Sequence, residues 1–241
     1  IGQEIFLSLV NLKVKKIIGL DKNEETLAAL KMNLKKNNLN NDKYELKLFD
    51  VCNIENCNFL IKEEKFDIIF HAAAYKHVDI VEENPTTAIF NNIIGLHNII
   101  DSSAKYGVDN FVFVSTDKAV NPSNIMGSTK RYGELIVKFY KKLSGRKYIS
   151  VRFGNVIGSS GSLLQILKKQ LVAGGPITLT HPEATRYFMT IKEAVSLVLK
   201  STTLNDNGDI YVLKMGDPIN IYKLMKDFLK NNNSKEKTDN N

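Results

Sequence analysis

The sequence predicts an α/β fold built on a doubly wound parallel sheet, with helices covering both faces. Short runs of β-branched and aromatic residues alternate with longer helical patterns up to residue 153, which is typical of successive βαβ units. The runs at 17–20 and 111–114 are apolar almost throughout, as expected of strands that helices bury on both sides. The composition, 43% hydrophobic and 24% charged, is that of an ordinary globular protein.

The elements of this first part can be assigned in chain order. Strands are predicted over residues 14–20, 44–49, 66–71, 110–115 and 148–153. Helices are predicted over residues 23–36, 85–105 and 128–143. Together they predict a nucleotide-binding domain over residues 1–153.

The alternation changes after residue 153. A GSSGS run at 158–162 precedes a helical pattern, which GGP at 174–176 ends. Helices over 191–201 and 219–230 flank a predicted strand over 209–213. We expect a small substrate-binding lobe over 154–230, and a disordered tail over the Asn- and Lys-rich residues 231–241.

Several classes of protein do not fit this composition. The net charge is +7, but the lysines are scattered and no basic stripe is interleaved with aromatic residues, so we expect no nucleic-acid partner. No apolar run reaches the length of a membrane span, and no signal peptide is visible. Cys52 and Cys57 stand without further ligands, so we expect no metal site and two thiols in a reducing cytoplasm.

The start of the chain resembles the second half of a dinucleotide-binding turn. Gly2 opens a helical apolar pattern, and Asp21 stands at the end of the next predicted strand. A carboxylate there hydrogen-bonds the adenosine ribose and selects NAD, while Asp50, after the following strand, is expected near the adenine. Taken alone, Gly2 and Asp21 are better explained as an ordinary turn glycine and a helix cap. We expect the first strand and most of the Gly-rich loop upstream of Ile1.

Small residues follow the predicted strand 66–71. Ala72 and Ala73 would let the backbone approach a cofactor closely, and Lys76 falls at the carboxyl edge of the sheet, where such folds bind ligands. His71 considered alone is more often a structural histidine than a catalyst.

The segment after the predicted strand 110–115 carries the chemistry. Thr116, Asp117 and Lys118 place a hydroxyl, a carboxylate and an ammonium in succession. Short-chain dehydrogenases keep a Tyr and a Lys four residues apart on one helix face, where the ammonium lowers the pKa of the phenol. Here Lys130 is present, but Met126 holds the Tyr position, and a thioether cannot act as a base.

Several ordered motifs resemble the CapD-like polysaccharide biosynthesis family. These are extended short-chain dehydrogenases with a Rossmann-like fold, and they include UDP-N-acetylglucosamine 4,6-dehydratases. Methionine at the Tyr position resembles the membrane-anchored branch, and against the family pattern both ends of the chain are expected to be truncated. The motifs are TDK at 116–118, NPSN at 121–124, MGSTK at 126–130, RFGNV at 152–156, GSSGS at 158–162 and THPEATRYFMT at 180–190.

The resemblance implies an NAD-dependent dehydration of a UDP-sugar. Oxidation at C4 acidifies the C5 proton, C6 loses its hydroxyl, and the hydride returns to C6. Thr116 would then bind the C4 oxygen, Asp117 protonate the departing hydroxyl and Lys118 remove the C5 proton. Lys130 would hold the nicotinamide ribose. The substrate-binding residues implied are Lys76, Asn155, Ser162, Thr180 and Arg186.

Two other functions fit the same residues. A nucleotide-sugar epimerase could use this scaffold, although simple C4 epimerisation needs no elimination acid such as Asp117. The chain could also be an inactive fragment that binds a nucleotide sugar. The resemblance further implies a homo-oligomer in the cytoplasm, or at the cytoplasmic face of the inner membrane in a longer protein.

Overall fold

The computed structural model describes residues 1–39, 42–158, 163–174, 176, 178, 181–204 and 208–236. The chain forms two compact units. The first combines Ile1–Arg152 with Val195–Leu213, and the second combines Phe153–Ala194 with Lys214–Asn241. The first unit thus includes a segment from the stretch that the sequence assigns to the lobe.

The strands of the first unit form two parallel sheets. One pairs β1 (Ile17–Asp21) with β2 (Tyr44–Leu48). The other has the order β3-β4-β5-β9, and its strands are β3 (Ile68–His71), β4 (Asn110–Val114), β5 (Lys147–Arg152) and β9 (Ile210–Val212). The predicted parallel α/β class is confirmed, and all these strands turn their carboxyl ends the same way within each sheet.

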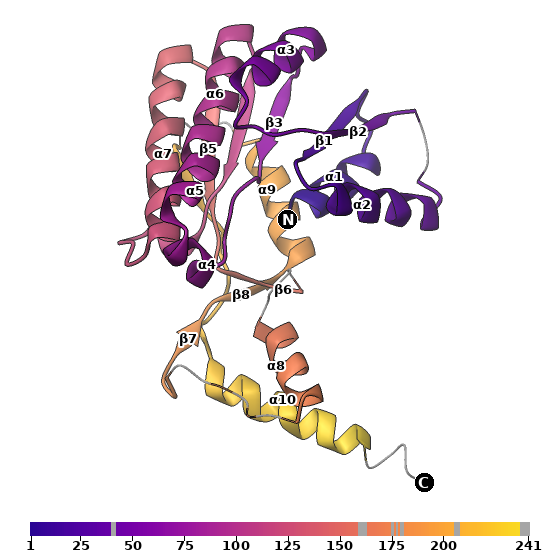
Figure 1. The fold of residues 1–241 in the computed structure, drawn as a ribbon, viewed down its shortest axis with the longest axis vertical. Helices are drawn as coiled ribbons and strands as arrows, with labels where there is room; N and C mark the ends of the chain where they lie inside the picture. Colours follow the sequence, from indigo (N-terminus) through magenta and orange to yellow (C-terminus); the bar gives the residue numbers. More distant parts are fainter. Residues whose placement is uncertain are drawn as a thin grey trace. The chain divides into compact units, whose positions relative to one another are not determined.

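Helices enclose the four-stranded sheet. Figure 1 shows α3 (Ile54–Glu64), α6 (Gly95–Tyr106) and α7 (Ile125–Ser144) on one side of it and α9 (Ile191–Ser201) on the other. The core between them is built mainly from Leu96, Ile100, Phe111, Phe113 and Tyr148, which are at most 1% exposed. Beside β1 lie α1 (Gly2–Val10) and α2 (Glu24–Lys36). The two helices pack together in a second core that includes Phe6 of α1 and Leu34 of α2.

The helix predicted over 85–105 is present and runs to Tyr106, with a π-helical turn inside it. It consists of three consecutive segments: α5 (Pro85–Ile89), the π-helical turn η1 (Phe90–Ile94) and α6. A separate helix, α4 (Val78–Glu83), precedes them. The π-turn widens the helix where two asparagines, Asn91 and Asn92, are buried, and their side-chain bonds give the physical reason for the interruption.

Helix α7 begins earlier than its periodicity predicts. The side chain of Asn124 accepts a hydrogen bond from the backbone N–H of Gly127, so the helix starts at Ile125. Gly133 lets α7 lie close to β4, because a Cβ there would come within 2.6 Å of the Phe113 ring. Gly145, in the left-handed region at φ 66°, ends the helix.

The second unit contains short strands and two helices. β6 (Asn155–Ile157) pairs in parallel with β8 (Phe188–Thr190), and β7 (Thr185–Arg186) pairs with β10 (Ile219–Asn220) in antiparallel fashion. Leu167 of α8 (Leu163–Val172) packs with Ile221 and Met225 of α10 (Ile221–Glu236). α10 extends six residues into the tail predicted to be disordered, and 237–241 lie outside the described residues. Within the part of the chain that is described, no helix has the length and apolarity to cross a bilayer.

Candidate active site

The start of α1 lies beside the end of β3. A Cβ placed on Gly2 would stand 3.6 Å from the Cβ of Ala72. Gly2 therefore lies against the small side chain of Ala72. The first turn of a helix leaves its N–H groups without intrahelical acceptors, so such a turn can receive an anion. Ala73 and Lys76 follow in the same loop, and both are exposed.

The two predicted adenosine-side carboxylates each cap a turn after a strand. Asp21, the last residue of β1, accepts a hydrogen bond from the Asn23 backbone N–H at 2.9 Å. Asp50, which follows β2, accepts one from the Cys52 backbone N–H at the same distance. Both carboxylates are thereby held at the carboxyl edge of the β1–β2 sheet, where the two strands end side by side.

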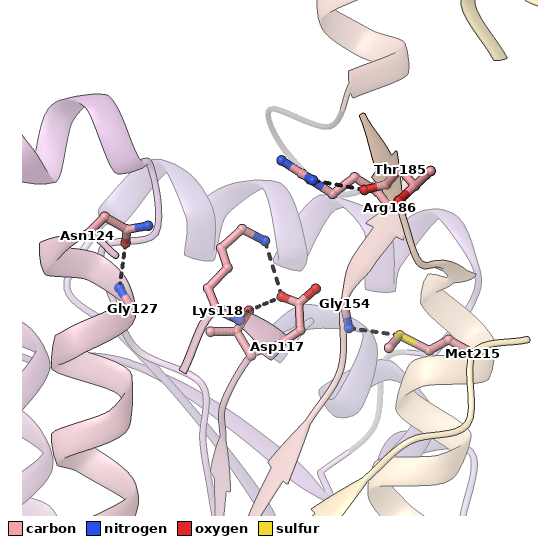
Figure 2. A network of polar contacts seen from close by, with 9 residues as sticks. Asp117, Lys118, Asn124, Gly127, Gly154, Thr185, Arg186 and Met215 are labelled. Atoms are coloured by element: carbon pink, nitrogen blue, oxygen red, sulfur yellow. Dashed lines mark hydrogen bonds and ion pairs between the residues drawn. The ribbon is translucent and has the colours of Figure 1, made fainter. Parts of the chain in front are cut away.

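Thr116, Asp117 and Lys118 converge on one carboxylate oxygen. Asp117 Oδ1 accepts from the Thr116 hydroxyl at 3.0 Å and from Lys118 Nζ at 3.3 Å (Figure 2). The turn that holds them is the short helix η2 (Asp117–Ala119), which Thr116 caps. The side chains of Asp117 and Lys118 are 31% and 34% exposed, so both are partly shielded and still reachable.

The first turn of α7 lies directly against this segment. A Cβ on Gly127 would come within 2.5 Å of the Lys118 carbonyl oxygen, closer than any real contact of that kind, so only glycine fits there without displacing the backbone of Lys118. Met126 is buried and packs against Val81 and Ala88. Its thioether therefore fills a core position in this structure.

Lys130 is buried on the inner face of α7. Its ammonium donates to the Val114 carbonyl at 2.8 Å and lies 4.6 Å from the centre of the Phe113 ring. Burial lowers the pKa of Lys130 to about 8, while the charge of Glu134 acts in the opposite direction. Lys130 thus ties the end of β4 to α7, and its ammonium has further donors for a ligand.

A buried polar network, which sequence reasoning missed, supports the Ala72–Lys76 loop. The Asn92 side-chain amide bonds both the backbone N–H and the carbonyl of Tyr75, at 2.8 and 3.0 Å, and also reaches the hydroxyl of Thr129 at 3.1 Å. Lys22, next to Asp21, donates to Asn91 at 2.7 Å and to the Tyr75 hydroxyl at 2.5 Å. The available signal was the pair of asparagines in an otherwise apolar helical face.

In the second unit, the structure places two of the four predicted substrate residues. Asn155, in β6, donates its backbone N–H to the Tyr187 carbonyl at 3.0 Å. Arg186, in β7, is exposed and donates to the Thr185 carbonyl at 2.8 Å (Figure 2). Nearby, the Gly154 N–H lies 2.9 Å from Met215 Sδ. Ser162 and Thr180 lie outside the described residues.

The two cysteines are free thiols. Burial raises the pKa of Cys52 to about 11 and that of Cys57 to about 12. Among the residues described, no group of three or more His, Cys, Asp or Glu side chains could hold a metal ion.

A family model described as polysaccharide biosynthesis protein matches residues 1–241. The chain belongs to this family. The family predicted from the motifs is therefore confirmed. Capsular polysaccharide biosynthesis protein CapD of Staphylococcus aureus is 41% identical over 237 residues, which are 98% of this chain and 40% of CapD. The chain thus spans about two fifths of the length of that relative.

Relatives with named reactions fall into two groups. A UDP-N-acetylglucosamine 4,6-dehydratase (inverting) of Campylobacter jejuni is 32% identical over 189 residues, covering 71% of this chain and 57% of that enzyme. A UDP-glucose 4-epimerase of Rickettsia prowazekii is 35% identical over 179 residues, covering 73% and 52%. The family member described here is similar to both kinds of enzyme.

Solved structures confirm the fold. Pen from Bacillus thuringiensis superposes with a TM-score of 0.88 at 28% identity, over 95% of this chain and 69% of that one. The dTDP-glucose 4,6-dehydratase DesIV of Streptomyces venezuelae, solved as a double mutant with NAD bound, gives 0.85 at 17% identity over 95% and 77%. The second likeness shows the fold alone.

Proposed function

We propose that this member of the polysaccharide biosynthesis family carries the catalytic residues of an NAD-dependent 4,6-dehydratase that acts on UDP-N-acetylglucosamine. One observation supports the proposal most: an acid and a base, Asp117 and Lys118, stand 3.3 Å apart at the carboxyl end of β4. Ligands of open α/β sheets bind at that edge. Elimination of water needs both a proton donor for the leaving hydroxyl and a base for the neighbouring carbon.

The first unit fits NAD. We propose that the N–H groups at the start of α1, where Gly2 lies next to Ala72, bind the pyrophosphate. Asp21 ends β1 in position to accept hydrogen bonds from the adenosine ribose, and we propose Asp50 on the adenine side. Lys130 would hold the nicotinamide ribose. When bound, NAD would supply the hydride acceptor at C4 and the hydride donor at C6.

The residues of the triplet take separate roles in this proposal. Thr116 accepts a hydrogen bond from the C4 hydroxyl while its own hydroxyl donates to Asp117, and it thereby orients the sugar. Asp117, in its protonated form, gives its proton to the C6 hydroxyl as that group leaves as water. Lys118, in its neutral form, takes the proton from C5. After the hydride returns to C6, Lys118 gives a proton back to C5, so that Lys118 and Asp117 both regain their starting protonation states.

Met126 leaves the proton of the C4 hydroxyl without the tyrosine base of other short-chain dehydrogenases. Because the thioether is buried against Val81 and Ala88, we assign it a packing role within the site. Asp117, which already contacts the Thr116 hydroxyl, is the carboxylate placed to receive the C4 proton through that hydroxyl. The same carboxylate would then be protonated for its later role at C6.

For the nucleotide part of the substrate, we propose Asn155 and Arg186 of the second unit. Lys76 of the first unit is proposed as a further substrate-binding residue. Arg186 carries a planar guanidinium on an exposed strand, which suits a diphosphate. Ser162 and Thr180 remain candidates for the same role.

An epimerase is the second candidate, supported by the 35% identity to the Rickettsia prowazekii enzyme. An epimerase returns the hydride to C4 and leaves the mass of the sugar unchanged. The adjacent acid and base favour dehydration, because epimerisation at C4 loses no hydroxyl.

The test is a product assay with UDP-N-acetylglucosamine and NAD⁺, followed by mass spectrometry. We expect a product lighter by one water, and its formation should fall by a factor of about 100 or more in Lys118→Ala. Lys105→Ala, which removes an exposed lysine on α6, serves as the matched control and should retain full activity. A product of unchanged mass and altered C4 configuration would replace the dehydratase by the epimerase.

A further inference from the structure

Glu134, in the third turn of α7, has a carboxylate that is fully enclosed. Its side chain is 0% exposed. It accepts four hydrogen bonds: from the Ser115 hydroxyl at 2.7 Å, from Arg152 Nε and Nη2 at 2.6 and 2.5 Å, and from Arg131 Nη1 at 3.1 Å. The partners are the residue that follows β4, the last residue of β5 and a residue of α7 itself, so one carboxylate joins three parts of the fold.

A buried carboxylate of this kind is costly unless its partners fix it. Burial acts to raise the pKa of Glu134, but the hydrogen bonds from Arg152, Ser115 and Arg131 outweigh burial and hold the pKa below its usual value. The group therefore stays ionised. Arg152 is bidentate, with a side chain 13% exposed, and such charge-assisted pairs have little freedom of geometry. Replacing a buried ion pair by apolar residues is often neutral for stability, so stability alone does not explain the pair.

Through Ser115, the Glu134–Arg152 pair is connected to the proposed catalytic residues 116–118. Ser115 directly precedes Thr116, and its backbone N–H is bonded to Val151 of β5 at 2.8 Å. One turn earlier on α7, Lys130 holds the carbonyl of Val114. Two successive residues at the end of β4 are thus attached to adjacent turns of α7, one through its carbonyl and the other through its hydroxyl.

We propose that Glu134 is a positioning residue for the reaction, which acts through Ser115 to set where Asp117 and Lys118 stand relative to α7. The inference rests on the proposed function for its chemistry. Glu134 touches neither substrate nor cofactor, because its carboxylate is enclosed by Ser115, Arg131 and Arg152. Arg152, the last residue of β5, binds the same carboxylate and so fixes the end of β5 relative to α7.

Ser115→Ala tests this with little risk to folding, because it removes one hydroxyl and leaves the Glu134–Arg152 pair in place. The chain offers a matched control on the neighbouring strand. Ser150, on β5, is 1% exposed, and its hydroxyl has no hydrogen-bond partner among the described residues. Ser150→Ala therefore makes the same change in the same sheet without touching the Glu134 carboxylate.

Two quantities are measured on the full-length protein. The first is hydrogen–deuterium exchange of the amides of residues 116–119, which needs no substrate. We expect Ser115→Ala to speed this exchange by about threefold or more and Ser150→Ala to leave it unchanged. The second is kcat, which should fall about tenfold in Ser115→Ala, with KM and the Kd for NAD⁺ within about twofold of the wild type. A purely structural serine would lower Tm and leave kcat per folded molecule unchanged.

The outcomes separate the inference from the proposed function. Equal exchange in the two serine variants overturns the positioning role, and so does faster exchange with an unchanged kcat. Glu134→Gln, which keeps the shape and removes the charge, should lower kcat further and make the added Ser115→Ala change less costly than it is alone, because both act through one contact. If the wild type forms no dehydrated product, the proposed function fails, and exchange alone decides whether Glu134 fixes the segment.

Discussion

At the scale of single residues, Asp117 accepts hydrogen bonds from a hydroxyl and an ammonium that are its immediate neighbours in the chain. Three reactive side chains in succession could be recognised from the sequence because no tertiary contact is needed to bring them together. The close approach of Gly127 to the Lys118 carbonyl could not be recognised from the sequence, because it depends on how α7 packs against η2.

Asp117→Asn should lower kcat for dehydration by a factor of about 100 or more, since an amide cannot protonate the leaving hydroxyl. Binding of NAD⁺ should change little, because the substitution keeps the shape of the side chain. Steady-state kinetics with UDP-N-acetylglucosamine, together with a titration of NAD⁺, measure both. Asp109→Asn, whose side chain is 76% exposed, is the control. Undiminished turnover in Asp117→Asn would remove Asp117 from the mechanism.

Gly127→Ala should displace the Lys118 backbone, because the new methyl group would lie 2.5 Å from its carbonyl oxygen. We expect a loss of about 1–3 kcal/mol in the free energy of unfolding, as for other overpacked sites, and a fall in kcat of at least about tenfold. Urea denaturation and the product assay give the two quantities. Ser128→Ala, one residue along the helix, should affect neither strongly; an active and stable Gly127→Ala protein would contradict the close approach.

At the scale of elements, periodicity accounts for most of the agreement between sequence and structure, while caps explain where the helices begin. Asn23 and Asn124 cap α2 and α7 through side chains that a reader of the sequence can recognise. The predicted helix over 85–105 is present, but its π-turn was not predicted, because only the tertiary contacts of Asn91 and Asn92 to Lys22 and Tyr75 show why the helix widens there. Periodicity describes one face of a helix and does not report a π-turn.

Because Lys130 is buried between α7 and β4, the free energy of unfolding should depend on pH near the lowered pKa of this lysine. Its pKa is about 8 in the folded state and about 10.4 in an unfolded chain. Below pH 8 both states are protonated, and the cost of burying the charge is present in full. Between pH 8 and about 10 only the unfolded state keeps the proton, so the free energy of unfolding should rise with pH, by up to about 3 kcal/mol.

The measurement is urea denaturation of the wild type and Lys130→Met at several pH values between 7 and about 10. The difference between the two proteins isolates Lys130 from the other groups that titrate in this range. A wild-type stability that rises relative to Lys130→Met supports the buried, depressed ammonium. A constant difference would mean that Lys130 keeps an ordinary pKa and is reached by solvent.

At the scale of the whole molecule, the chain is organised as two compact units and matches a family model along its length. The parallel sheet and the family were predictable, since both are written in strand composition and in ordered motifs. The return of Val195–Leu213 to the first unit was not, because β9 joins the sheet beside β5 only through long-range pairing. The candidate site shows the same division: its contiguous triplet was predicted, while Glu134 and Asn92 emerged only from contacts between elements.

The central claim is that this family member removes water from a nucleotide sugar through Asp117 and Lys118. The most direct measurement is the mass of the product formed from UDP-N-acetylglucosamine and NAD⁺ in D₂O. Removal and replacement of the C5 proton predict a product that has lost one water and carries one carbon-bound deuterium at C5, and Lys118→Ala should not form it. A product of unchanged mass without deuterium, or a dehydrated product formed equally well by Lys118→Ala, would contradict the account.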